Sequence, residues 1–82
     1  MNIEDIIEKT ISILADEFEV DEEVIQPNAI LKDTLGLDSL DYVDLVVTIE
    51  TNFGVKLVEA DFATVSTFQD FYILIEHKLK MK

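Results

Sequence analysis

Apolar residues recur at three- and four-residue steps along three stretches of the chain, the spacing that gives an α-helix one apolar face. The first stretch predicts a helix over residues 3–18, with Asn2 as its N-cap. The second predicts a helix over residues 39–52, capped by Asp38 and ended by Gly54. The last predicts a helix over residues 68–80, capped by Thr67.

The segments between these helices lack a sustained period. Pro27 prevents a continuous helix within residues 19–37, so we expect a long loop broken by a short turn over residues 21–25. The apolar residues expected to hold this loop against the core are Val24, Ile25, Ile30, Leu31 and Leu35. Gly36 suits a positive φ before the next helix. For residues 55–66 we expect a loop followed by a short helix over residues 59–63.

The composition fits one small all-α domain spanning residues 1–82. The chain has 82 residues, of which 49% are hydrophobic, with two Gly, one Pro and no Cys. Few turn-forming residues argue against a sandwich or barrel, and the absence of Cys excludes disulfides and thiol catalysis. We therefore predict a small four-helix bundle of three main helices and one short helix, with the long loop between the first two main helices.

The charge of the chain restricts its partners. Eighteen acidic residues stand against six lysines and no arginine, a formal net charge of −12. Fourteen of the acids and two of the lysines lie in residues 1–50. Such a chain does not suit nucleic acid, which requires cations, or an anionic membrane surface. No apolar run could span a bilayer, and no targeting signal is recognisable. We expect a cytoplasmic monomer that is steered electrostatically to basic protein partners.

The predicted helix over residues 39–52 has two apolar stripes, although a bundle helix needs only one. The stripe suited to the core consists of Tyr42, Leu45, Val46, Ile49 and Phe53. A second stripe, about a hundred degrees away, consists of Leu40, Val43 and Val47. We expect this second stripe to be exposed and to form, with neighbouring carboxylates, a docking surface for a partner with a basic rim and an apolar centre. The residues predicted to bind partners are Asp38, Leu40, Asp41, Val43, Asp44, Val47 and Glu50. The alternative is that this helix is the central, most buried one.

Ser39 lies at the start of the same helix, where its hydroxyl should be exposed and where the local amides and the helix dipole favour an attached negative group. We do not expect catalysis by Ser39, because the only His, His77, lies at the far end of the chain with a cluster of lysines. A calcium loop starting at Asp33 would place Leu35 and Leu37 at ligand positions and lacks the required Gly, so we expect no dedicated metal site. We therefore expect that the protein is not an enzyme.

The segment LGLDSLDYVDL, residues 35–45, resembles the signature of the acyl carrier proteins. The resemblance extends over nearly the whole chain, through the apolar first helix, Asp33, Glu50, Phe53 and the final amphipathic helix. It implies a four-helix fold and a covalent 4′-phosphopantetheine joined to Ser39 through a phosphodiester, with Asp38 and Leu40 as the flanking residues of the attachment site. Thr51 and Asn52 follow Glu50 where carriers of fatty acid synthesis usually continue with acidic residues.

The resemblance also implies a function. Acyl intermediates would ride as thioesters on the arm, and the second main helix would be recognised by the phosphopantetheinyl transferase and by acyl-processing enzymes. Fatty acid synthesis is the expected pathway, which would make the chain a phosphoprotein of lipid metabolism. The alternatives are a specialised carrier for polyketide, aminoacyl or modified-lipid synthesis, and an unmodified acidic interaction module.

We further expect the interior of the bundle to open and hold an acyl chain. Small β-branched residues on the second main helix leave adjustable space near Ser39, and the short third helix is weakly anchored. The predicted lining of this acyl-chain pocket is Leu45, Val46, Ile49, Phe62, Val65, Phe68 and Tyr72.

Overall fold

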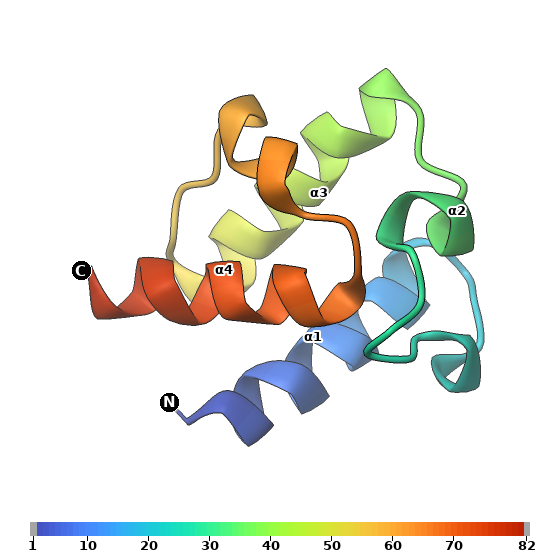
Figure 1. The fold of residues 1–82 in the computed structure, drawn as a ribbon, viewed down its shortest axis with the longest axis horizontal. Coiled ribbons are helices and arrows are strands. Elements are labelled where there is room, and N and C mark those ends of the chain that lie inside the picture. The colour runs from blue at the N-terminus through green and yellow to red at the C-terminus, as the bar shows by residue number, and fades with distance from the viewer. Residues whose placement is uncertain (1, 82) are drawn as a thin grey trace.

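The computed structural model describes residues 2–81. Its elements, in chain order, are α1 (Ile3–Glu17), the 3-10 helix η1 (Glu22–Val24), α2 (Leu31–Leu35), α3 (Ser39–Phe53), the 3-10 helix η2 (Glu59–Thr64) and α4 (Phe68–Lys80). α1 packs against α4, α3 runs obliquely to both, and η2 lies beside α3 (Figure 1). The predicted all-α bundle is confirmed, and each predicted main helix ends within one residue of its observed bound.

Side-chain caps fix where α1 and α4 begin, as the sequence predicted. The Asn2 side chain accepts a hydrogen bond from the Asp5 N–H at 2.8 Å. At α4, Thr67 Oγ1 accepts from the Asp70 N–H at 3.2 Å, and the Asp70 carboxylate accepts in return from the Thr67 N–H at 3.2 Å. Each cap satisfies amides that the first turn of a helix leaves without partners.

The predicted positive φ at Gly36 and the predicted end of α3 at Gly54 are confirmed. Gly36 has φ +64° and ends α2, and Gly54 has φ +70° and ends α3. Both lie in the left-handed region that residues with a β-carbon rarely adopt. The chain can therefore stop one helix and turn sharply into the next segment at these two points.

The segment between α1 and α3 differs from the prediction. The turn expected over residues 21–25 is present as η1, but the five-residue helix α2 was not predicted. Ile25, Leu31 and Leu35 are buried, whereas the expectation that Val24 and Ile30 also reach the core is wrong, because they are 45% and 43% exposed.

Backbone pairing explains the exposure of Ile30. An isolated antiparallel bridge joins Ile30 to Thr67, with the Leu31 N–H donating to the Ser66 carbonyl at 2.9 Å. Extended residues send successive side chains to opposite sides. Leu31 therefore enters the core and Ile30 faces outward.

One hydrophobic core joins all the main helices. Its buried apolar residues are Ile6, Leu14, Ile25, Leu31, Leu35, Leu37, Leu45, Ile49, Phe53, Val55, Leu57, Phe68, Phe71, Tyr72 and Ile75. The segment after α3 is extended and sends alternate residues inward, so Val55 and Leu57 are buried between exposed neighbours although the segment pairs with no strand among residues 2–81.

Two lysines tie separate elements together in this acidic chain. Lys9 on α1 donates to the Asn52 carbonyl near the end of α3 at 2.7 Å, and its ammonium lies 5.0 Å from the centre of the Phe53 ring. Lys78 on α4 pairs with Asp61 on η2 at 3.3 Å. Both contacts are tertiary, so they limit how far α3 and η2 can move from the other helices.

The end of α1 contains a backbone conformation that its residue disfavours. Glu19 is exposed and has φ +55°, and the following Val20 N–H donates to the Ala15 carbonyl at 3.1 Å, closing the helix. We predict that Glu19→Gly stabilises the fold by about 0.5–1 kcal/mol, because Gly adopts this conformation without the cost that a β-carbon imposes. Urea unfolding measures the change.

Glu19→Gln is the matched control for that substitution. It removes the same negative charge but keeps the β-carbon in the left-handed conformation. If Glu19→Gln stabilises the protein as much as Glu19→Gly, the gain comes from reduced charge repulsion and the conformational explanation is wrong.

The stability of the fold should have a maximum at an intermediate pH. Repulsion among carboxylates weakens it at high pH, and loss of the carboxylate caps weakens it at low pH. Backbone N–H donors from Val58, together with Lys78, hold the pKa of Asp61 below its ordinary 3.8, and donors from Thr67 and Ser66 do so for Asp70. The interactions that lower these two pKa values stabilise the folded protein at pH values above 3.8. This stabilisation is lost as the pH falls through the pKa that each carboxyl has in the folded state. The melting temperature should rise as pH falls from 7 toward about 5, because repulsion weakens, and then fall below 3.8.

Salt tests the repulsion independently of pH. Added NaCl or millimolar divalent cations should raise the melting temperature at pH 7, since the Debye length shortens to about 8–10 Å at physiological ionic strength. A melting temperature that responds to neither salt nor divalent ions would contradict the repulsion hypothesis.

Candidate functional site

Ser39 is the first residue of α3, and two carboxylates fix it there. Asp38 Oδ1 accepts from the N–H groups of Leu40 and Asp41 at 2.9 and 3.1 Å. Asp41 Oδ2 accepts in return from the Asp38 N–H at 3.1 Å, which completes the predicted capping box. The Ser39 side chain is exposed at the helix start, so its hydroxyl is accessible to another protein.

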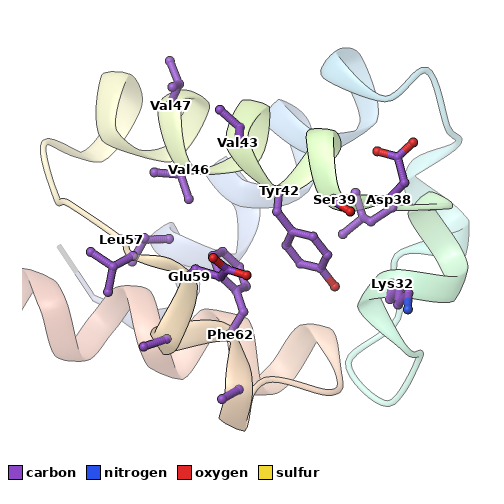
Figure 2. A pocket seen from close by; sticks show the side chains of 14 residues that line it. Lys32, Asp38, Ser39, Tyr42, Val43, Val46, Val47, Leu57, Glu59 and Phe62 are labelled. Atoms are coloured by element: carbon purple, nitrogen blue, oxygen red, sulfur yellow. The ribbon is translucent and has the colours of Figure 1, made fainter.

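The same caps change the expected role of the backbone amides. The sequence suggested that free amides at the start of α3 would favour an attached negative group, but the N–H groups of Leu40 and Asp41 already bond to Asp38. Lys32 on α2 lines the same groove as Ser39 (Figure 2). Its positive charge suits an anionic substituent at Ser39.

A groove of about 1280 Å³ runs from Ser39 between α3 and η2. Small-molecule sites are typically about 300–1,000 Å³, so this groove has room for a long flexible group. Its lining is mainly apolar and consists of Lys32, Leu37, Asp38, Ser39, Tyr42, Val43, Val46, Val47, Leu57, Val58, Glu59, Ala60, Phe62 and Ala63. The residues present therefore fit a phosphopantetheine arm on Ser39, with the cationic Lys32 and mainly apolar walls in the same groove.

The two apolar stripes of α3 are separated as the sequence predicted. Leu45, Ile49 and Phe53 of the first stripe are buried, and Tyr42 and Val46 are partly buried against the core. The second stripe is exposed, at 77% for Leu40, 60% for Val43 and 55% for Val47. The alternative that this helix is the central, most buried one is therefore wrong.

The carboxylates expected around the exposed stripe have two kinds of surroundings. Asp44 and Glu50 are exposed, and no hydrogen bond or ion pair within residues 2–81 engages their side chains. Asp38 and Asp41 are part of the capping box, so they also stabilise α3. Only the first pair can be changed without disturbing the helix start.

The seven residues predicted to line an acyl-chain pocket fall into two groups. Val46 and Phe62 line the groove. Leu45, Ile49, Phe68 and Tyr72 are buried in the core, and Val65 is partly buried against it. Burial raises the pKa of Tyr72 to about 12, so its phenol stays neutral.

Several groove residues escaped the sequence analysis. Leu57, Val58 and Glu59 lie after α3, in a segment whose spacing predicted only a loop and a short helix. Lys32 could have been noticed as the sole lysine between Lys9 and Lys56. Nothing in the periodicity of the sequence indicated that these residues would line the same groove as Ser39.

The acidic side chains and His77, which were also considered as metal ligands or catalytic groups, do not gather into a metal site within residues 2–81. Within residues 2–81, no group of three His, Asp or Glu side chains is placed to hold a metal ion. His77 is exposed in the last turn of α4, where a positive charge suits the helix dipole. No helix in the described part of the chain is long and apolar enough to cross a membrane.

Comparison with known proteins agrees with this geometry. The family described as "Phosphopantetheine attachment site" matches residues 8–75. An acyl carrier protein of Thermotoga maritima is 46% identical over 76 residues, which cover 93% of this chain and 94% of that protein. One from Thermosynechococcus vestitus is 37% identical over 79 residues, covering 96% and 98% of the two chains. One from Syntrophobacter fumaroxidans is 39% identical over 64 residues, covering 78% and 79%.

These matches extend over both the helical framework and the start of α3, and they agree with the resemblance found in residues 35–45. The chain therefore belongs to the acyl carrier proteins, a family of carriers with a covalently bound 4′-phosphopantetheine.

Proposed function

We propose that the protein holds acyl intermediates on a phosphopantetheine attached to Ser39 and presents them to the enzymes of fatty acid synthesis. The observation that supports the attachment point is the exposed Ser39 in the lining of the groove, fixed by the Asp38–Asp41 capping box. When bound, the group supplies the thiol that this chain lacks, on which cargo is held as a thioester. The chain's own residues position the arm and present a docking surface.

The attachment chemistry belongs to a phosphopantetheinyl transferase. Ser39 has no His as a neighbouring general base in the sequence, and Asp38 and Asp41 are engaged with backbone amides. The transferase must therefore activate the hydroxyl itself. What this chain provides is an accessible hydroxyl in a fixed position.

The docking surface is the exposed stripe Leu40, Val43 and Val47 with its carboxylate rim. Its apolar centre would be desolvated on binding, while the net charge of −12 attracts enzymes that have basic patches.

We further infer that the protein works as a cytoplasmic monomer. The strong acidity and the similarity to acyl carrier proteins favour fatty acid synthesis. The loss of acidic residues at Thr51 and Asn52 is the feature that favours a specialised carrier instead.

We predict that Ser39→Ala folds normally and gains no mass when incubated with coenzyme A and a phosphopantetheinyl transferase. Ser12→Ala and Ser66→Ala are matched controls, because both serines are also exposed. Both controls should gain the mass of one phosphopantetheine by mass spectrometry. A mass gain in Ser39→Ala would disprove the assignment.

The loaded protein then distinguishes the pathways. Holo-protein offered a panel of fatty acyl, polyketide and aminoacyl donors with their cognate loading enzymes should accept malonyl and fatty acyl groups most efficiently. Preferential loading by an aminoacyl or polyketide donor would replace fatty acid synthesis with the specialised alternative.

We predict that charge and apolar substitutions on α3 change different rate constants of transferase binding. Asp44→Lys and Glu50→Lys should slow association by roughly ten-fold at low salt and weaken its salt dependence. Val43→Ala and Val47→Ala should each speed dissociation by about five-fold, equivalent to about 1 kcal/mol. Stopped-flow or surface plasmon resonance measures both constants.

Thermal melting provides the control for these variants. Val43 and Val47 are exposed, so their truncation should change the melting temperature little. If the valine variants lose stability in proportion to binding, the stripe belongs to the core and is not a docking surface.

A further inference from the structure

Lys32 is the one cation among the described residues that line the groove. The other charged residues of that lining, Asp38 and Glu59, are both acidic. An arm on Ser39 brings the negative charge of a phosphodiester to this already acidic surface. Because like charges repel, Lys32 is the side chain of the lining that can offset the added charge.

The ammonium of Lys32 has no partner within residues 2–81. Its side chain is exposed, and no hydrogen bond or ion pair in that part of the chain engages it. Other lysines are already used, since Lys78 and Lys80 form ion pairs and Lys9 donates to a backbone carbonyl. An ammonium on a flexible four-carbon stem can therefore bind an anion that is added after folding.

The backbone holds Lys32 in a fixed place relative to Ser39. The Lys32 carbonyl accepts from the N–H of Leu37, two residues before Ser39, at 3.0 Å. The neighbouring Leu31 is buried, and its N–H donates to the Ser66 carbonyl at 2.9 Å. Only the Lys32 side chain has to be ordered when it meets a group on Ser39, so the entropic cost of the contact is small.

We propose that Lys32 is a positioning residue for the arm, whose ammonium pairs with the phosphodiester on Ser39. In Figure 2, Lys32 lies on α2 below the start of α3, whereas Val43 and Val47 point upward from α3. Pairing with Lys32 therefore draws the base of the arm toward α2 and leaves the docking stripe uncovered. This inference rests on the proposed attachment of the arm at Ser39.

Melting temperatures of the apo and holo forms at low salt test the pairing. Attachment of the arm should lower the melting temperature by about 2 °C more in Lys32→Gln than in the unmutated protein, because the variant leaves the phosphodiester beside carboxylates alone. Each holo form is compared with its own apo form, which cancels the general effect of removing a positive charge. The extra decrease should vanish in about 0.5 M NaCl, where charges are screened.

Two further variants control for charge in general. Lys32→Arg keeps the positive charge and should behave like the unmutated protein. Lys56→Gln removes the same charge from an exposed lysine that does not line the groove, so attachment of the arm should cause no extra decrease. The proposal is wrong if Lys32→Gln shows no extra decrease, or if Lys56→Gln shows the same one.

Nuclear magnetic resonance of the holo form gives a reading that a purely structural role of Lys32 would not produce. In the unmutated protein, the ε-methylene protons of Lys32 should show nuclear Overhauser contacts to the methylene of the arm next to the phosphate. The ³¹P chemical shift should change in Lys32→Gln and stay close to the unmutated value in Lys32→Arg. Absence of the contacts in the unmutated protein would overturn the proposal whatever the melting temperatures show.

Mass spectrometry of each holo sample separates this inference from the function beneath it. Absence of a phosphopantetheine on Ser39 would mean that the proposed attachment has failed. A fully modified protein whose phosphodiester makes no contact with Lys32 would leave the carrier function standing and disprove the role of Lys32 alone.

Discussion

The position of α3 depends on two carboxylates that cap it reciprocally. Asp38 takes the N–H groups of Leu40 and Asp41, and Asp41 takes the N–H of Asp38. The box fixes where the helix begins and so places the exposed Ser39 in its first turn. Successive helical residues are about 100° apart around the axis, so the apolar pattern that follows turns Leu45 and Ile49 toward the core and Val43 and Val47 toward solvent.

Acidity has opposing effects in this small bundle. The carboxylates on the helix starts stabilise the fold through local hydrogen bonds, whereas repulsion among the many acidic side chains is predicted to weaken it. Lysines offset the repulsion where they join separate elements, as Lys9 does at the end of α3 and Lys78 at η2. The surface thus carries a negative charge that its own stability does not require, and the lysine contacts between elements offset part of it.

The groove exists because α3 and η2 share few contacts beyond a small set of side chains. The aromatic stack of Tyr42, Phe62 and Phe71 bridges them, and the remaining space stays open along α3. A six-residue 3-10 helix has poorer hydrogen-bond geometry than an α-helix, so its position is set by tertiary contacts. Ser39 is held on a long, capped helix, while the opposite wall of its groove belongs to the more adjustable element.

The sequence by itself determined the local features of this protein. Apolar spacing predicted the three long helices, and Asn2, Asp38, Thr67 and Gly54 marked their boundaries, because capping and left-handed glycines involve residues a few positions apart. The two stripes of α3 could also be predicted, since 82 residues offer too little interior to bury both. The residues 35–45 identified Ser39 as the candidate attachment site by resemblance.

Only the tertiary structure decided how distant segments meet. The bridge between Ile30 and Thr67 turned Ile30 outward and helped place α2, which the sequence pattern did not reveal. Lys32 comes to line the same groove as Ser39, and Phe62 comes against Tyr42, twenty residues away in the chain. These pairings involve no local hydrogen bond or helical period. They follow from the simultaneous packing of α3, η2 and α4 around one core, which no stretch of sequence specifies alone.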